Sequence, residues 1–341
     1  MTARQESIAS LGEFGLIREL FAPLQTPGVP GVVLGIGDDA AVLTPARTQE
    51  LVITTDTLVE GMHFAADMDP YLLGRKTLLV NLSDLAAMGA TPHWALLSLA
   101  LPPATALHWA KEFARGLGEA CRTFSVALVG GDTVSTTHGG TVITLTLMGM
   151  AGQGRAMTRK GATPGDLICV TGTIGDSALG LAVRQGRLKA EGDDAVFLTD
   201  RHQLPSPRVA LGVKLLDAAI VRACIDVSDG FAADLGHLCE ASGVAAEVDA
   251  DRMPYSPAAR RQLTRHGPEW ESTLLSGGED YELIFAMTEG AMEFLTPLCE
   301  ETKTPVTVVG RFIEAATGEP RVRIRRGGEL LRFSQEGWRH F

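Results

Sequence analysis

Short apolar runs typical of buried strands alternate with longer helical segments along this chain of 341 residues. The alternation begins again after a glycine-rich stretch at 149–165. Strands that alternate with helices in both halves predict an α/β (α+β) fold with two lobes of similar size. We expect the boundary near residue 150, so that the domains are 1–150 and 151–341. This length gives each domain ample residues for a hydrophobic core.

Local patterns place the expected elements within these halves. In the first half we expect helices at 8–24, 70–88 and 104–122, and strands at 32–36, 51–55, 94–101, 125–129 and 141–150. In the second half we expect helices near 175–185, 207–219, 230–241 and 290–301, and strands at 167–171, 222–226, 244–248, 281–286 and 305–311. The polar segment 189–200 is expected to be a surface loop or the start of a helix, and the segments 187–203 and 250–272 fit no motif.

Charge and cysteine usage exclude several classes of protein. The chain has 30 basic and 41 acidic residues, a net charge of −11, which argues against a nucleic-acid partner because such proteins need a basic face. No two cysteines form a C-x-x-C pair, so we expect reduced thiols and neither disulfides nor a zinc site. The cysteines are Cys121, Cys169, Cys224, Cys239 and Cys299. No apolar run reaches the ~18 residues that a membrane helix needs, so we expect a cytoplasmic protein with no membrane partner.

Six short polar islands carry carboxylates between apolar segments. They read GIGDDA at 35–40, TTDT at 54–57, NLSD at 81–84, VGGDT at 129–133, DVSDG at 226–230 and SGGED at 276–280. A buried carboxylate without a partner costs several kcal/mol, so such islands belong at the mouth of a sheet. Six of them predict one convergent acidic cleft that requires cations.

The residue types of these islands favour a site for a magnesium nucleotide. Carboxylate oxygens are hard ligands that suit Mg²⁺, which also binds phosphates. Glycines let backbone N–H groups approach an anion closely. One aspartate alone is more often a turn former or a helix N-cap, and Asp229 could cap the helix that follows it. Six such islands together favour the phosphate site.

Familiar nucleotide and hydrolase signatures are missing. The sequence has no G-x-x-x-x-G-K-[ST] loop, and Gly35-Ile36-Gly37 is followed by two aspartates rather than by a dinucleotide fingerprint. It has no protein-kinase motif pair, no G-x-S-x-G and no H-E-x-x-H. Any phosphate chemistry therefore depends on the acidic islands.

Eight ordered blocks resemble the thiamine-monophosphate kinase family, from about residue 11 to the C-terminal residues 337–341. The blocks are GIGDDAAV, TTDTLVEGMHF, VNLSDLAAMGATP, LVGGDT, AMTRKGATPGD, VTGTIGDSALGL, IDVSDGFAADLGH and LSGGEDYEL. The family belongs to the superfamily of aminoimidazole ribonucleotide synthetase and selenophosphate synthetase.

The resemblance implies a fold, an activity and partners. It implies an N-terminal lobe, 1–150, that binds ATP and Mg²⁺ and dimerises through its sheet, and a C-terminal α/β lobe, 151–341, that closes the cleft. It implies ATP-dependent phosphorylation of thiamine monophosphate to thiamine diphosphate by a homodimer. The acceptor phosphate is already an anion, so we expect no covalent nucleophile and no general base, and direct in-line transfer between Mg²⁺-bound phosphates.

The roles of the family carry over to positions of this sequence. The resemblance implies that several Mg²⁺ ions are held by Asp39, Thr54, Thr55, Asp56, Asp84, Asp132, Asp226 and Asp229. It implies ATP contacts from Gly131, Asp132, Arg159 and Ser228, and substrate contacts from His63, Glu279 and Trp338.

Other interpretations remain open at this point. The chain could be another ATP-dependent enzyme of the same superfamily that acts on a different phosphorylated small molecule. It could be a magnesium-nucleotide sensor without activity, or a metal-dependent phosphatase. Glu279 could be a further acid that faces a metal, and Trp338 could be an aromatic residue that docks the C-terminal tail.

Overall fold

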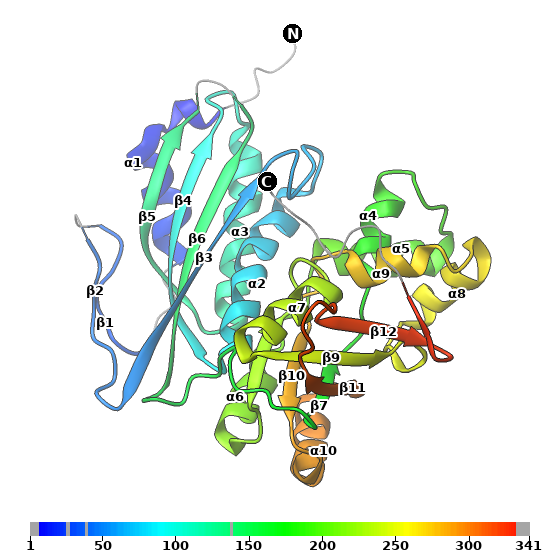
Figure 1. Cartoon of the computed structure of the whole chain (residues 1–341). Coiled ribbons are helices and arrows are strands. Elements are labelled where there is room, and N and C mark those ends of the chain that lie inside the picture. The colour runs from blue at the N-terminus through cyan, green and yellow to red at the C-terminus, as the bar shows by residue number, and fades with distance from the viewer. Residues whose placement is uncertain (1–6, 25–27, 38–39, 137–138, 332–341) are drawn as a thin grey trace. The chain divides into compact units, whose positions relative to one another are not determined.

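The computed structural model describes residues 7–24, 28–37, 40–136 and 139–331 (Figure 1). The chain forms two compact units, one of Met1–Leu85 with Thr91–Gly154 and one of Ala86–Ala90 with Arg155–Phe341. Each unit has its own sheet and its own helices, which confirms the predicted mixture of helices and strands.

The first unit is built on a sheet of four strands in the order β3-β6-β4-β5. The strands are β3 (Gln49–Val59), β4 (Thr91–Leu101), β5 (Ala127–Ser135) and β6 (Val142–Gly152). Neighbours are antiparallel except β4 and β5, which are parallel. A small separate sheet pairs β1 (Val32–Leu34) with β2 (Val42–Leu43).

Two helices, α2 (Pro70–Ala87) and α3 (Leu107–Thr123), accompany this sheet and touch each other backbone to backbone. A Cβ at Gly74 would lie 2.1 Å from the Phe113 carbonyl oxygen, and one at Gly116 would lie 2.0 Å from that of Tyr71. The helices can therefore approach this closely only because both positions are glycine. Before the sheet, the expected helix at 8–24 is a run of short helical turns, namely η1 (Ile8–Ser10), α1 (Gly12–Leu16), η2 (Ile17–Phe21) and η3 (Ala22–Leu24).

The second unit is built on a sheet of seven strands in the order β13-β12-β9-β11-β7-β10-β8. The strands are β7 (Leu167–Thr171), β8 (Ala223–Asp226), β9 (Val244–Asp249), β10 (Leu283–Met287), β11 (Val306–Glu314), β12 (Val322–Arg326) and β13 (Glu329–Leu330). The helices are α4 (Asp176–Arg184), α5 (Gly192–Gln203), α6 (Val209–Ala218), α7 (Phe231–Ser242), α8 (Pro257–His266), α9 (Trp270–Ser276) and α10 (Met292–Thr302), with the short turns η4 (Ala250–Arg252) and η5 (Glu289–Ala291).

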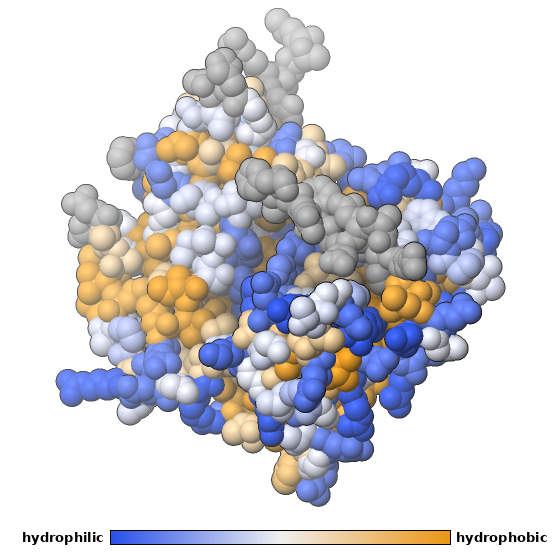
Figure 2. Space-filling view, in the orientation of Figure 1, coloured by the Kyte–Doolittle hydropathy of each residue, from blue (hydrophilic) through white to orange (hydrophobic). Residues whose placement is uncertain are grey.

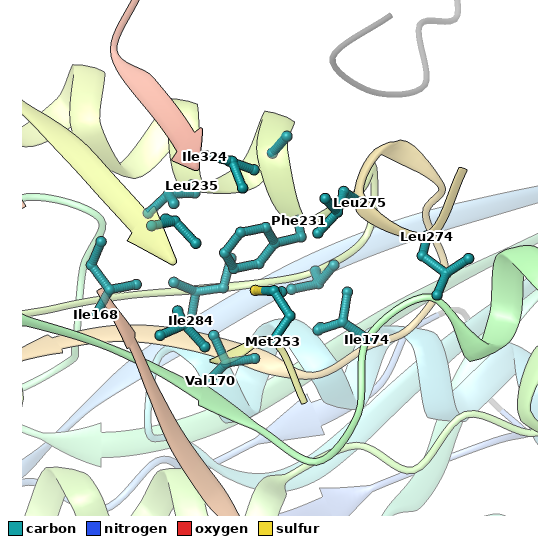
Figure 3. Close-up of a cluster of buried hydrophobic side chains, with 14 of the residues drawn as sticks. Ile168, Val170, Ile174, Phe231, Leu235, Met253, Leu274, Leu275, Ile284 and Ile324 are labelled. Atoms are coloured by element: carbon teal, nitrogen blue, oxygen red, sulfur yellow. The ribbon is translucent and has the colours of Figure 1, made fainter. Parts of the chain in front are cut away.

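Strands β7, β8 and β10 are buried along their whole length, which explains why they are apolar except for Thr171 at the end of β7 and Asp226 at the end of β8. In the core, Ile168 and Val170 of β7 and Ile284 of β10 lie against Phe231 and Leu235 of α7 (Figure 3). These strands end beside the loops that carry the acidic islands of this unit, so a rigid core supports those loops.

Three expectations from the sequence need correction. The segment 189–200 is not a surface loop: the alternative, the start of a helix, is correct, because α5 begins at Gly192 and buries Leu198 and His202. Helices α8 and α9 were not expected, although Ser256 and Pro257 are a standard start signal: the Ser256 side chain accepts a hydrogen bond from the Ala259 N–H. Asp56 and Asp132 lie within strands and not at strand ends.

The cysteines agree with the expectation of free thiols. All five are free, and only Cys299 is partly exposed. Within the described ranges, no helix combines the length and the apolar character needed to cross a membrane.

Candidate active site

The free edge of β3 and helix α2 bring three of the expected metal ligands together. Thr54 Oγ1 donates a hydrogen bond of 2.5 Å to Asp84 Oδ2. The Asp56 N–H donates one of 3.1 Å to the side-chain oxygen of Asn81, which lies one turn before Asp84 on α2. The structure therefore gathers Thr54, Asp56 and Asp84 at one place in the first unit.

The electrostatics of this place suit a divalent cation. Burial and, to a smaller extent, the nearby charge of Asp84 together raise the pKa of Asp56 to about 7. A divalent cation between the two carboxylates would relieve both the repulsion and the cost of burial. The donors are carboxylate and hydroxyl oxygens, which fit Mg²⁺ better than a softer metal.

Thr55 and Asp132 belong to the other face of the same sheet. Adjacent strand residues point to opposite faces, so Thr55 lies opposite Thr54 and Asp56. Its Oγ1 is 3.1 Å from Thr146 Oγ1 on β6. Asp132 of β5 is paired in register with Ser98 of β4, and its side chain is exposed. The expected ligands of the first unit thus divide into two sets.

A cavity of about 870 Å³ opens on the Thr146 face. Its lining joins the first and fourth acidic islands with β4 and β6, through Gly35–Gly37, Ala40, Ser98, Gly130–Thr133 and Thr146. Gly131 has φ +154°, and a Cβ there would lie 1.8 Å from the Leu97 carbonyl oxygen, so this position requires glycine. The volume falls in the range of roughly 300–1,000 Å³ that small-molecule sites occupy. Asp39 lies outside the described residues.

His63 lies in the turn after β3. Its Nδ1 accepts a hydrogen bond of 3.0 Å from the Val59 N–H. In a neutral imidazole this leaves the proton on Nε2 and fixes the orientation of the ring.

In the second unit, the loop 227–230 after β8 is held by the Asp234 carboxylate, which lies in the first turn of α7. Asp234 Oδ2 accepts hydrogen bonds from the N–H groups of Ser228, Asp229 and Gly230, at 3.0, 3.0 and 3.1 Å. The N-cap of α7 is Gly230 and no side chain caps it, so Asp229 is not the N-cap. Asp226 is the buried last residue of β8.

The loop 277–282 packs against this loop and carries three acids. The Glu279 N–H donates to the Ser228 carbonyl oxygen at 2.9 Å. Asp280 accepts from the N–H groups of Gly175 (2.6 Å) and Ser177 (3.1 Å), at the start of α4. These hydrogen bonds join the blocks VTGTIGDSALGL, IDVSDGFAADLGH and LSGGEDYEL of this unit.

Glu282 forms a buried ion-pair cluster that the sequence did not reveal. Its carboxylate accepts from Arg208 at 2.6 and 2.5 Å, from Arg201 at 3.0 Å and from the Thr171 hydroxyl at 2.7 Å. Arg201 comes from the segment 187–203 that fits no motif, Arg208 is the N-cap residue of α6, and no pattern in the sequence pairs either with Glu282.

Two further residues, Arg159 and Trp338, were expected to belong to the site. Arg159 is exposed, and its carbonyl oxygen accepts from Ser242 Oγ at 2.9 Å. Trp338 lies outside the described residues. Among the residues that the structure describes, no group of three or more His, Cys, Asp or Glu side chains could by itself hold a metal ion.

The titration of Asp280 gives a first testable prediction. Burial raises its pKa to about 8, against the opposing N–H groups of Gly175 and Ser177 and with help from Asp176. Because the raised pKa means that the fold prefers the neutral acid, this stabilisation is complete below about pH 4 and is lost as the pH rises through about 8. We expect the Tm to fall less between pH 6 and 9 in Asp280→Asn than in the wild type, as measured by calorimetry. Parallel Tm curves for the two proteins would contradict this role.

Comparison with known proteins identifies the family. The model of AIR synthase related protein, N-terminal domain, matches residues 37–151, and the model of the C-terminal domain matches 163–323. The chain is 43% identical over 334 residues to the thiamine-monophosphate kinase of Escherichia coli K12, covering 97% of this chain and 98% of that protein.

Solved structures agree with these matches. The crystal structure of thiamine-monophosphate kinase from Stenotrophomonas maltophilia is 41% identical with a TM-score of 0.78, covering 89% of this chain and 93% of that one. AaThiL complexed with AMPPCP and TMP is 30% identical with a TM-score of 0.74, covering 99% of this chain and 100% of that one. The resemblance read from the sequence is confirmed, and this chain belongs to the thiamine-monophosphate kinase family.

Proposed function

We propose that this protein phosphorylates thiamine monophosphate to thiamine diphosphate with ATP. The observation that carries the proposal is the match over nearly the whole chain to thiamine-monophosphate kinases. The structure of AaThiL also supports it: this relative matches nearly the whole chain and was solved with both AMPPCP, an ATP analogue, and TMP.

The nucleotide would enter the cavity of the first unit. Gly131 and Asp132 line that cavity, and the backbone at Gly131 can approach a phosphate closely because no side chain intervenes. From the second unit, we infer that Arg159 and Ser228 also contact the nucleotide. Arg159 is exposed and could form a bidentate contact with a phosphate.

We infer that Mg²⁺ ions are the resident metals. The proposed ligands are Asp39, Thr54, Thr55, Asp56, Asp84 and Asp132 in the first unit and Asp226 and Asp229 in the second. The oxygen donors and the mutual repulsion of Asp56 and Asp84 support this assignment. When bound, Mg²⁺ neutralises phosphate charge: two unit charges ~4 Å apart repel by roughly 4 kcal/mol at an effective dielectric of 20.

The side chains of the protein would act mainly by holding the reacting phosphates in position, without forming a covalent bond to them. The acceptor phosphate oxygen is already anionic, so no side chain has to remove a proton from it, and the γ-phosphoryl group can pass directly to it in line. Thr54 holds the Asp84 carboxylate and Asp234 holds the loop 228–230 before any ligand binds. Groups fixed in advance need no rearrangement during the reaction.

The thiamine part would be recognised by His63, Glu279 and Trp338. Glu279 can accept hydrogen bonds from the amino group of the pyrimidine ring, and the plane of Trp338 can stack on a flat ring. The Nδ1 contact that orients the His63 ring supports a specific polar role for it.

We further propose a homodimer that forms through the sheet of the first unit, in the cytoplasm, where ATP is supplied. Exposed apolar side chains on that sheet support the dimer: Leu51, Ile53, Leu96 and Val134. Figure 2 shows hydrophobic residues gathered over the strands of this unit. Sedimentation equilibrium should give twice the chain mass of 36.2 kDa, and a monomer mass would contradict the dimer.

The function is tested by incubating the protein with ATP, Mg²⁺ and thiamine monophosphate, followed by chromatography. We expect ADP and thiamine diphosphate in equal amounts. Inorganic phosphate released without ATP would indicate a phosphatase, and faster ADP release with an aminoimidazole ribonucleotide precursor would indicate another enzyme of the superfamily. ATP binding in calorimetry without any product would indicate a sensor.

A further inference from the structure

The loop 277–282 has a strained backbone that its surroundings hold in place. Glu279 has φ +67° and Tyr281 has φ +52°, both in the left-handed region that residues other than glycine rarely adopt. Such strain persists only where the neighbouring structure fixes it, and it is concentrated at functional sites. The strained backbone therefore holds the side chains of this loop in a defined geometry.

Two helix ends hold the three acids of this loop. Asp280 accepts from the first residues of α4, as described above. Two consecutive residues in the last turn of α5 reach the other two acids: Arg201 contacts Glu282, and His202 Nδ1 lies 3.2 Å from Glu279 Oε2. The last turn of α5 thus contacts the first and the last of the three acids, Glu279 and Glu282.

Only one of the three acids is accessible to a ligand. The Glu282 side chain is fully buried and Asp280 is 1% exposed, whereas the Glu279 side chain is 22% exposed. A carboxylate accepts several hydrogen bonds through its two oxygens, so the contact with His202 leaves capacity for a ligand donor. The buried Asp280 and Glu282 hold the loop in place, and the Glu279 carboxylate is the one that a ligand can reach.

The His202 ring is itself held in one orientation. It is buried, and its Nδ1 lies 3.1 Å from Ser177 Oγ on α4 as well as 3.2 Å from Glu279. A carboxylate only accepts hydrogen bonds, so a hydrogen bond between this ring and Glu279 requires the proton on Nδ1. A buried ring fixed by two helices therefore determines which way the Glu279 carboxylate turns.

We propose that His202 is a positioning residue that orients Glu279 toward the amino-pyrimidine ring of thiamine monophosphate. The proposal rests on the proposed function, in which Glu279 contacts that ring. Its consequence is specific: His202 sets the KM for thiamine monophosphate and leaves the KM for ATP unchanged, because its contact is to the substrate-binding acid. A residue needed only for folding would not separate the two constants.

The test compares variants that differ in where they carry a donor. Asparagine places an amide N–H near the position of Nδ1, glutamine places it near Nε2, and leucine has none. We expect His202→Leu and His202→Gln to raise the KM for thiamine monophosphate about tenfold, with kcat and the KM for ATP within about twofold, and His202→Asn to remain close to the wild type. If the leucine variant fails to fold, the contrast between glutamine and asparagine still decides.

A double-substitution cycle supplies the second readout. In a Glu279→Gln background, changing His202 should add little to the KM for thiamine monophosphate, since the residue acts through Glu279. Equal effects in both backgrounds, or equal rises in both KM values, would overturn the proposal. These comparisons of KM require that the wild-type protein forms thiamine diphosphate. A wild type without product would instead overturn the proposed function.

Discussion

Replacing Asp84 with asparagine is expected to lower kcat by at least about a hundredfold, since a bound metal contributes several kcal/mol of charge stabilisation. Asp84 accepts from Thr54 and lies beside the half-buried Asp56, so the substitution removes one of two carboxylates at this place. The fold should survive, because an amide oxygen can still accept from Thr54 and one repelling charge is lost. Steady-state kinetics over a range of Mg²⁺ concentrations should also show a higher Mg²⁺ requirement.

The same helix offers a matched control. Asp69 precedes α2, and its Oδ1 accepts from the Tyr71 N–H at 2.8 Å. Asparagine caps a helix as well as aspartate does, so Asp69→Asn should keep wild-type kcat. A wild-type rate for Asp84→Asn at saturating Mg²⁺ would remove Asp84 from the proposed metal ligands.

Replacing Glu282 with glutamine is expected to lower the free energy of unfolding by about 3–5 kcal/mol. The substitution removes the charge with which Arg201 and Arg208 are paired, at a position where the Glu282 side chain is fully buried. Breaking a buried ion pair on one side costs this much because the remaining charge stays out of water. Denaturant unfolding followed by circular dichroism measures the change.

An exposed ion pair supplies the comparison. Glu301 contacts Lys214 at 2.6 Å, but its side chain is 61% exposed. Glu301→Gln should therefore change the free energy of unfolding by less than about 1 kcal/mol. If the two variants lose equal stability, the Glu282 cluster is not the anchor of the loop 277–282.

The sequence predicts secondary structure best for segments whose side chains are completely buried. The strand expected at 167–171 has the bounds of β7, because a strand covered on both faces is an almost continuous apolar run, here Leu167–Val170, and stands out from its neighbours. For helix α5 the sequence left a loop and a helix start as alternatives, because the helix buries few side chains and carries acids at its start and basic residues at its end. Tertiary contacts of Leu198 and His202 decide its structure.

The site was predictable in its residue types but not in its pairings. The opposite orientation of Thr54 and Thr55 follows from the two-residue period of a strand and could have been read from the sequence. The contacts of Glu282 with Arg201 and Arg208 join residues 81 and 74 positions apart, and no local pattern encodes such contacts. The same holds for His202 and Glu279, which meet only because α5 ends beside the loop.

The most direct test of the account replaces Mg²⁺ with Mn²⁺, whose anomalous scattering locates it in a crystal. Crystals of the protein with Mn²⁺, AMPPCP and thiamine monophosphate should show an anomalous peak within about 2.0–2.3 Å of carboxylate oxygens of Asp56 and Asp84, as expected for a small divalent ion. A peak there would establish that Asp56 and Asp84 hold a divalent metal ion. A fully occupied ligand complex with no peak at either carboxylate, and with Asp84 still bound only by Thr54, would contradict it.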